Sequence, residues 1–329
     1  MALPHAVLIV GAGNIAGGFD SARDREALPL THAGAFSRHP AFSIMACIEP
    51  DETRGRAFAA HWGIPSLFSG FDQIDPPPGG FDVVSICSPT AAHVSDIEHA
   101  LTLEPRLIFC EKPITTDIAQ ARRAVLLCEQ AGVVLMVNHT RRWAPDVQKL
   151  RQEIVDGAWG AARSATGFYN KGILNNGSHM LDLLHYLVGE LTPLWAGAPI
   201  WDHWPDDPSM PAALAGPGSL PIMLNVADAR DYAFFELELV FEHAVIRMES
   251  GGSSWRVRRS VDSATFAGYK ALEGGQVRAG QYDLAMTNAI AEIAGVLATG
   301  DTPASTGKTA LAAQELCNRI RQLSKAPAE

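Results

Sequence analysis

Apolar residues gather in short runs along the first 138 residues, and helical stretches separate these runs. The runs are nearly continuous rather than alternating, which is typical of parallel strands that helices cover on both faces. The helical stretches end at Gly or before Pro, and Asp117 is a candidate N-cap. The pattern predicts βαβ units, with strands at 6–10, 42–48, 82–86, 106–110 and 133–137 and helices at 53–62, 91–103 and 118–131.

The pattern changes after residue 138. Segments 232–241 and 244–249 alternate apolar and polar positions, which predicts antiparallel strands with one solvated face. Segment 195–221 is rich in Pro, Trp and Asp and is interpreted as an ordered loop. We therefore expect an α/β chain with a doubly wound parallel sheet over residues 1–138 and a second domain over 139–329, with helices at 177–188, 282–297 and 308–323.

Composition narrows the class of protein. The 329 residues include 26 Lys plus Arg and 36 Asp plus Glu, and the net charge of −10 argues against nucleic acid as the main partner. A hydrophobic content of 47% excludes a disordered chain, and no apolar run approaches the ~20 residues that span a membrane. The five cysteines are scattered, mostly in apolar runs and without a CxxC pair, which favours a reduced, cytoplasmic protein without structural zinc.

A glycine-rich turn follows the first predicted strand. Gly11-Ala12-Gly13-Asn14-Ile15-Ala16 has the G-x-G-x-x-A pattern that offers backbone N–H groups to a pyrophosphate, although such turns also occur as punctuation alone. Glu49 ends the second predicted strand, where a carboxylate accepts hydrogen bonds from a ribose and repels a 2′-phosphate. The pattern thus predicts NAD rather than NADP. Glu49 follows Gly13 by 36 residues instead of ~20, so we expect an inserted loop over residues 19–28.

Glu111-Lys112-Pro113 follows the fourth predicted strand, at the sheet edge where open α/β folds bind ligands. A lysine whose pKa is lowered by desolvation can hydrogen-bond a substrate hydroxyl and help to move its proton. The alternative is an ion pair exposed to water at the strand end.

The predicted helix 177–188 carries His179, Asp182 and His185. His179 and Asp182 are neighbours at i, i+3, but the three side chains fan over about 120° of the helix, so we predict no metal site. By itself, His179 is more often a packed helical histidine than a catalytic one.

These residues occur together with Ser88-Pro89-Thr90-Ala91-Ala92-His93, Arg142-Trp143-Ala144-Pro145 and segment 175–187. In this order and spacing they resemble the glucose-fructose oxidoreductase / inositol dehydrogenase (Gfo/Idh/MocA) family. The resemblance implies an N-terminal Rossmann domain and a C-terminal α+β domain with an open, mostly antiparallel sheet. It also implies a nicotinamide cofactor, a carbohydrate-like small-molecule substrate, and a homodimer or homotetramer formed through that sheet.

The resemblance also implies roles for single residues. Lys112 would be the catalytic lysine, His179 would exchange the hydroxyl proton, and Asn175 stands where the family often has Asp. An amide can orient a partner but supplies no charge to it. Lys171 stands where many relatives have glycine, and it is either a contact for an acidic substrate group or a surface lysine. The cofactor set is Gly11, Ala12, Gly13, Asn14, Ile15, Glu49, Ser88, Pro89, His93, Glu111 and Lys112, and the substrate set is Arg142, Lys171, Asn175 and His179.

We therefore expect an NAD(H)-dependent oxidoreductase that transfers hydride to or from a secondary alcohol or ketone of a sugar, polyol, sugar acid or nucleotide-sugar. One alternative is a non-catalytic dinucleotide-binding regulator of the same fold, which the Asn175 difference motivates. Another is a reductase of a non-sugar carbonyl or imine.

Overall fold

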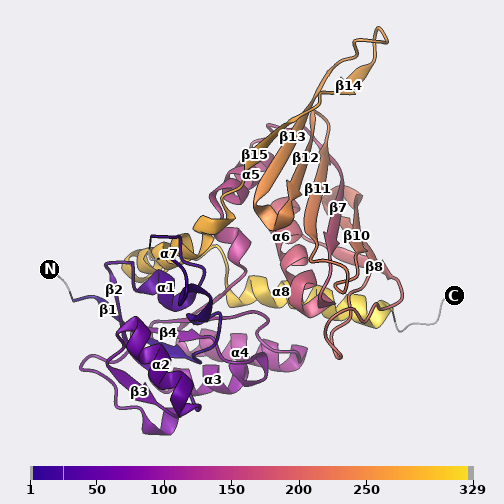
Figure 1. The fold of residues 1–329 in the computed structure, drawn as a ribbon. Coiled ribbons are helices and arrows are strands. Elements are labelled where there is room, and N and C mark those ends of the chain that lie inside the picture. Colours follow the sequence, from indigo (N-terminus) through magenta and orange to yellow (C-terminus); the bar gives the residue numbers. More distant parts are fainter. Residues whose placement is uncertain (1–2, 25, 325–329) are drawn as a thin grey trace. The chain divides into compact units, whose positions relative to one another are not determined.

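The computed structural model describes residues 3–24 and 26–324 (Figure 1). The chain divides into two compact units. The first joins Met1–Trp143 to Asp283–Leu311, and the second joins Ala144–Tyr282 to Ala312–Glu329. Helix α8 (Gly307–Leu323) begins in the first unit and ends in the second.

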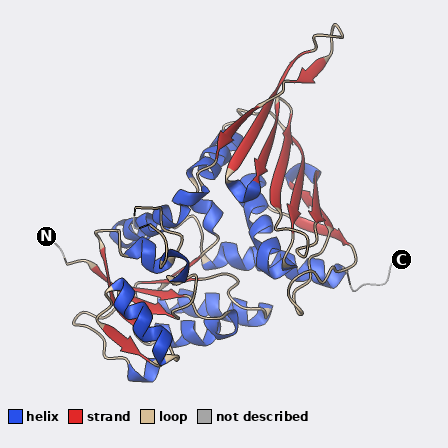
Figure 2. Cartoon of the chain, in the orientation of Figure 1, coloured by secondary structure: helices blue, strands red, loops and turns tan. Residues whose placement is uncertain are grey.

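The first unit is built on a parallel six-stranded sheet in the order β3-β2-β1-β4-β5-β6. This is the doubly wound order that places ligands beyond the carboxyl ends of the strands. The predicted Rossmann topology is confirmed. Its strands are β1 (His5–Val10), β2 (Phe42–Ile48), β3 (Ser66–Phe68), β4 (Val83–Ile86), β5 (Leu107–Cys110) and β6 (Val134–Val137). Its helices are α1 (His32–Phe36), α2 (Glu52–Trp62), α3 (His93–Leu101), α4 (Ile118–Ala131) and α7 (Ala285–Thr299) (Figure 2).

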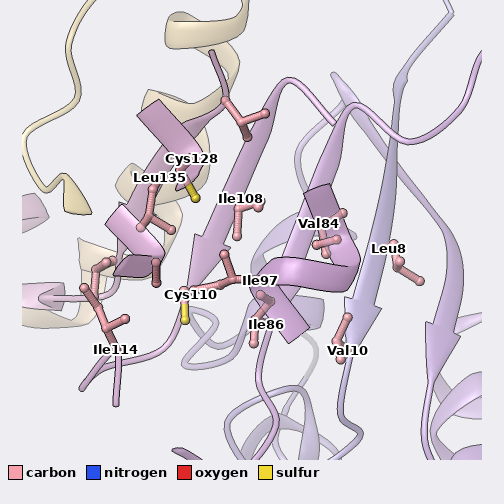
Figure 3. Close-up of a cluster of buried hydrophobic side chains, with 14 of the residues drawn as sticks. Leu8, Val10, Val84, Ile86, Ile97, Ile108, Cys110, Ile114, Cys128 and Leu135 are labelled. Carbon is pink, nitrogen blue, oxygen red and sulfur yellow. The ribbon is translucent and has the colours of Figure 1, made fainter. Parts of the chain in front are cut away.

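Helices α3 and α4 cover one face of this sheet. The core there consists of alternate strand residues packed against the apolar sides of the two helices, as Figure 3 shows. Labelled members include Leu8, Val84, Ile108, Ile97 and Cys128, all of them buried. Ser85, between Val84 and Ile86, points to the opposite face, which carries α1.

The helix that should follow the glycine-rich turn is interrupted. Gly17 N–H donates to Gly13 O at 3.2 Å, and the chain then leaves the helix. It returns at α1, where His32 N–H donates to Ile15 O at 3.2 Å and Ala33 N–H donates to Ala16 O at 2.8 Å. The hydrogen-bond pattern of a single helix thus stops after Gly18 and resumes at His32, so residues 19–31 are an insertion within that helix. Without them, Glu49 would follow Gly13 by 23 residues instead of 36, which explains the long spacing.

The second unit is built on a larger, mostly antiparallel sheet in the order β14-β13-β12-β11-β7-β10-β9-β8, with β15 paired to β13. Among the described strands of this second sheet, only β7 and β10 pair in parallel. The strands are β7 (Ala162–Tyr169), β8 (Thr192–Ala196), β9 (Ala212–Gly216), β10 (Leu220–Val226), β11 (Phe235–Phe241), β12 (Ala244–Glu249), β13 (Ser254–Asp262), β14 (Lys270–Leu272) and β15 (Gln276–Ala279). The helices are α5 (Pro145–Val155) and α6 (Ser178–Val188).

Helix α6 packs against one face of this sheet. At Gly167 in β7 a Cβ atom would lie 2.9 Å from Met180, so glycine permits the close approach of the helix. Along β11 every second residue is buried, which matches the predicted strand with one solvated face.

Two predictions on the domain layout need correction. The sequence places a single boundary between residues 138 and 139, whereas residues 139–143 and 283–311 belong to the first unit. Trp143 Nε1 donates to Glu292 of α7 at 2.6 Å, and Ser305 Oγ donates to Val137 O at 2.7 Å. Segment 195–221, interpreted as a loop, contains β9 and the start of β10.

None of the helices within residues 3–24 and 26–324 has the length and hydropathy to cross a membrane.

Candidate functional site

The glycine-rich turn packs closely against the end of β4. Gly11 has φ +90°, and a Cβ atom there would lie 2.8 Å from Ser88 N and 2.9 Å from the Cys87 carbonyl carbon. Any other residue would be strained at this position. A Cβ atom at Gly13, by contrast, would have no heavy atom of the described chain within 4 Å, apart from its own neighbours in sequence. The turn is therefore tight on its inner side and open at Gly13, as a cradle for a pyrophosphate requires.

Glu49 connects this turn to the end of β2. Its Oε2 accepts from Ala12 N–H at 2.9 Å, and its Oε1 accepts from Asp51 N–H at 3.0 Å and from Arg54 at 2.8 Å. Burial raises the pKa of Glu49, but the Arg54 side chain and the two backbone N–H groups outweigh this and lower it. Glu49 is therefore held as a carboxylate at the end of β2, beside the turn.

Two further loops lie at the carboxyl ends of β4 and β5, and His93 joins them. Its Nδ1 lies 2.9 Å from Pro113 O and its Nε2 lies 2.8 Å from Ser88 O. His93 is 1% exposed, so its ring contacts the backbone of both loops rather than solvent. Lys112, which a cis peptide bond joins to Pro113, is half-buried, and Pro89 is exposed.

In the second unit, one turn of π-helix (Gly172–Gly177) leads directly into α6. Single π-helical turns within helices are frequent at functional sites. Asn175 lies in this turn, where its Nδ2 donates to Lys171 O at 3.0 Å, and His179 is half-buried in the first turn of α6. The structure therefore brings Lys171, Asn175 and His179 into one continuous segment of the second unit.

The segment from Asp202 to Ser209 holds this π-helical turn. Five consecutive N–H groups, which the start of a helix leaves without partners, all donate to it. Asp202 and Asp207 are 4% and 8% exposed, so both carboxylates work in the interior. The bonds run from Lys171 N to Asp202 (2.9 Å), Gly172 N to Ser209 Oγ (2.9 Å), Ile173 N to Pro208 O (2.9 Å), Leu174 N to Asp207 (2.9 Å) and Asn175 N to Asp207 (2.9 Å).

Backbone geometry makes this arrangement specific. Lys171 adopts the left-handed conformation, with φ +65°, which is uncommon for a residue with a side chain. Gly172 has φ +92°, and a Cβ atom there would lie 2.1 Å from Asp207 Oδ2. Burial raises the pKa of Asp207, and the Leu174 and Asn175 N–H groups act in the opposite direction.

Arg142, the remaining substrate candidate, lies in the first unit. It is 4% exposed, and its guanidinium donates to Ala304 O at 2.8 Å. Its role toward a substrate stays a prediction. Within the described part of the chain, no group of three or more His, Cys, Asp or Glu residues is arranged to hold a metal ion.

Residues 5–139 match the model of the oxidoreductase family with an NAD-binding Rossmann fold, named GFO_IDH_MocA. By this match, the Rossmann domain of the chain is similar to the Gfo/Idh/MocA family. The chain is 31% identical over 176 residues to a D-apiose dehydrogenase of Paraburkholderia graminis, covering 46% of this chain and 45% of that one. It spans about half the length of the curated relatives that it matches.

Solved structures share the fold of this chain over nearly its whole length. A 3-ketoreductase from Actinomadura kijaniata, in complex with NADP and TDP-benzene, has a TM-score of 0.76 at 17% identity, with 97% of this chain and 98% of that chain covered. The WlbA dehydrogenase from Bordetella pertussis, in complex with NADH and UDP-GlcNAcA, has a TM-score of 0.76 at 16% identity, with 99% and 98% covered. The predicted fold class is thus confirmed for both units.

Several residues that shape the site were missed from the sequence. Asp202, Asp207 and Ser209 lie in the segment interpreted as a loop, where the Asp-rich stretch before Ser209 was the available signal. His32 and Asn138 hold the Glu111 side chain, and neither belongs to a motif recognised in the sequence.

Proposed function

We propose that this protein is an NAD(H)-dependent oxidoreductase of the Gfo/Idh/MocA family that acts on a secondary alcohol or ketone in a carbohydrate-like substrate. The observation that carries the proposal is that the family's Rossmann domain retains an open glycine cradle together with Lys112 at a strand end. The D-apiose dehydrogenase and the other sugar and polyol dehydrogenases among its relatives support the substrate class.

The residues present fit a nicotinamide dinucleotide. Backbone N–H groups from Gly13 to Ile15 would hold the pyrophosphate, and Glu49 would accept from the adenosine ribose. The loops of Ser88-Pro89 and Glu111-Lys112, which His93 joins through their carbonyl groups, would line the rest of the dinucleotide. When bound, the nicotinamide supplies a hydride acceptor or donor.

The proposed chemistry of the protein is proton transfer at the substrate oxygen. In the oxidation direction, the Lys112 ammonium donates a hydrogen bond to that oxygen and His179 takes the hydroxyl proton as the C–H hydride leaves. Asn175 orients the substrate or the imidazole through its side-chain amide. Reduction runs through the same groups, with His179 returning the proton.

Turnover with and without Lys112 tests this proposal. NADH absorbance is followed with a panel of free sugars, inositols, sugar acids and nucleotide-sugars, and NAD binding is measured separately by calorimetry. Lys112→Met should lower turnover by at least about 10²-fold and leave NAD binding within about twofold. Lys149→Met, at an exposed lysine of α5, is the matched control. Unchanged turnover in Lys112→Met would contradict the role, and NAD binding without turnover of any panel member would contradict the substrate class.

The preference for NAD is a separate part of the proposal. Glu49 stays ionised through Arg54 and two backbone N–H groups, and its charge opposes a 2′-phosphate. Calorimetric titration should give tighter binding of NAD than of NADP, and Glu49→Ser should reduce this ratio by about tenfold or more. Tighter NADP binding by the unmodified protein would overturn the preference and would assign Arg54 to the phosphate.

Two further expectations belong to the proposal. We expect a homodimer or homotetramer, which light scattering at working concentration tests. All five cysteines are buried and unpaired, which supports a reducing, cytoplasmic environment.

A further inference from the structure

A buried histidine lies in the interior of the first unit, at the point where the interrupted helix resumes. His32 is the first residue of α1, and its side chain is 0% exposed. Its Nδ1 lies 2.7 Å from Ser85 Oγ in β4, and its Nε2 lies 2.8 Å from Glu111 Oε1 beyond the end of β5. Both ring nitrogens therefore have polar partners although water does not reach the ring.

Glu111 receives a second donor at the same oxygen. Asn138, just beyond β6 and 2% exposed, donates from Nδ2 to Glu111 Oε1 at 2.6 Å. The carboxyl ends of β5 and β6 and the start of α1 thus meet around one carboxylate oxygen. The Glu111 residue is 9% exposed, so this carboxylate is directed into the domain.

The pKa values of both groups shift in the directions that favour their charged forms. Burial alone lowers the pKa of His32, but Cys87 and Glu111 outweigh it and raise this pKa to about 10. Burial raises the pKa of Glu111, whereas the hydrogen bond and charge of His32, the Asn138 amide and the Lys112 charge lower it. The titratable groups facing His32 are Glu111 and Cys87, and Phe109 packs beside the ring at 4.7 Å between centroids.

Glu111 is the residue before Lys112, and the two side chains interact electrostatically. A carboxylate without another cation would hold the lysine as its ion-pair partner and stabilise its ammonium form. His32 supplies that other cation from the opposite side, and Asn138 fixes the oxygen between them.

We propose that His32 is a positioning residue for Lys112, acting through Glu111: it holds the carboxylate in the interior and offsets its charge, so that Lys112 is directed to the substrate. The role of Lys112 rests on the proposed function, whereas the link from His32 to Lys112 does not. The link can therefore be measured on the amine itself.

The first measurement is competitive acylation of lysines with acetic anhydride at pH 8, quantified by mass spectrometry, with the exposed Lys149 as internal reference. His32→Gln retains an N–H donor and removes the charge. Because Glu111 is ionised at this pH, the labelling of Lys112 relative to Lys149 should fall by about threefold or more. In a Glu111→Gln background, the same change at His32 should leave the ratio unaltered, because the carboxylate charge that His32 offsets is absent.

The second measurement separates positioning from a purely structural role. In His32→Gln, kcat should fall by about tenfold with KM within about twofold, because orientation at the reacting atom is lost while substrate binding is retained. Asn138→Ala, which removes only the second donor, should change both readouts in the same direction by less. His61→Gln, at an exposed histidine of α2, is the matched control and should change neither.

The outcomes are distinct. Equal labelling of Lys112 in His32→Gln and the unmodified protein overturns the link, as does a drop that persists in the Glu111→Gln background. If His32→Gln does not fold, an unaltered labelling ratio in Asn138→Ala overturns it. Full turnover in Lys112→Met would remove the proposed function and leave the labelling test of the link valid.

Discussion

The two domains hold their proposed functional residues by different kinds of contact. In the first domain, side chains contact one another: His32 and Asn138 meet on Glu111, beside Lys112. In the second domain, side chains hold the backbone: Asp202 and Asp207 accept from N–H groups of the π-helical turn that carries Asn175. The charges of a side-chain pair change with pH. Backbone N–H groups do not titrate, so their positions stay fixed at any pH above the pKa of the carboxylates that accept from them. The contacts in the first domain can therefore change the charge around Lys112, whereas those in the second domain fix the position of Asn175.

The largest effect is expected where backbone N–H groups would lose their acceptor. Asp207→Ala leaves the Leu174 and Asn175 N–H groups buried without the carboxylate, so the free energy of unfolding should fall by about 3 kcal/mol. Urea denaturation measures this fall. Asp207→Asn retains one acceptor oxygen and should lose less, and exposed Asp206→Ala is the matched control. Equal stability of the Asp206 and Asp207 variants would contradict the fixed-position view of this domain.

A pH-dependent effect, smaller per pH unit than the loss at Asp207, is expected in the first domain. The pKa of His32 rises from 6.5 to about 10 on folding, so its contribution to stability is fully present below pH 6.5 and is lost as the pH rises toward 10. The pKa of Glu111 is lowered from 4.5, so its contribution is present above that pH and is lost on acidification. Unfolding free energies measured from pH 6.5 to 10 should decline by at most about 1.4 kcal/mol per pH unit for the His32 proton.

His32→Gln should flatten this decline, because the group that titrates is removed. The exposed His61→Gln should retain it. An identical pH dependence in all three proteins would show that the pair in the first domain is not the pH-sensitive contact.

A substitution at Lys171 is expected to stabilise the protein, with an increase of up to about 1 kcal/mol in the free energy of unfolding. Lys171→Gly relieves the left-handed backbone conformation and should raise the free energy of unfolding by about 0.5–1 kcal/mol. Lys149→Gly within α5 should lower it by about 1 kcal/mol. If Lys171 contacts an acidic substrate group, KM for the sugar acids of the panel should rise in the same variant. A stabilised protein with unchanged KM would make Lys171 a surface lysine.

The smallest effect is expected from deletion of residues 19–31. Gly18 would then lead directly to His32, and the helix would continue through bonds that already exist to Ile15 and Ala16. Unfolding free energy should change by less than about 1 kcal/mol, since a loop of this length adds little to the closure entropy. Calorimetry should find NAD affinity within about threefold. A folded deletion protein that no longer binds NAD would place the insert in the cofactor site.

Local signals predicted much of the fold. Helix α4 begins and ends at the predicted residues, because Asp117 caps its first turn at Gln120 N–H and Gly132 ends it with φ +67°. Strands β2 and β12 also have the predicted bounds. Strand β10 was missed because Pro221 interrupts its pattern, although an exposed Pro is tolerated where it lies.

The supporting contacts of the site could not be predicted in the same way. Lys112, Asn175 and His179 stand in contiguous motifs, so their candidacy was visible in the sequence. His32 lies 79 residues from Glu111, and Asp207 lies 32 residues from Asn175. Neither pairing follows from periodicity or capping, because each arises only when folding brings together segments that are distant in the sequence.

The interrupted helix also has a practical use in protein engineering. The two hydrogen bonds from His32 and Ala33 to Ile15 and Ala16 hold the two ends of the insertion together, whatever sequence joins those ends. The junction between Gly18 and His32 is thus a natural acceptor site for a foreign module, such as a peptide epitope or a ligand-responsive domain. Since His32 is the first residue after the junction, strain from such a module would be transmitted to Glu111 and the neighbouring lysine, which would make the graft a switch.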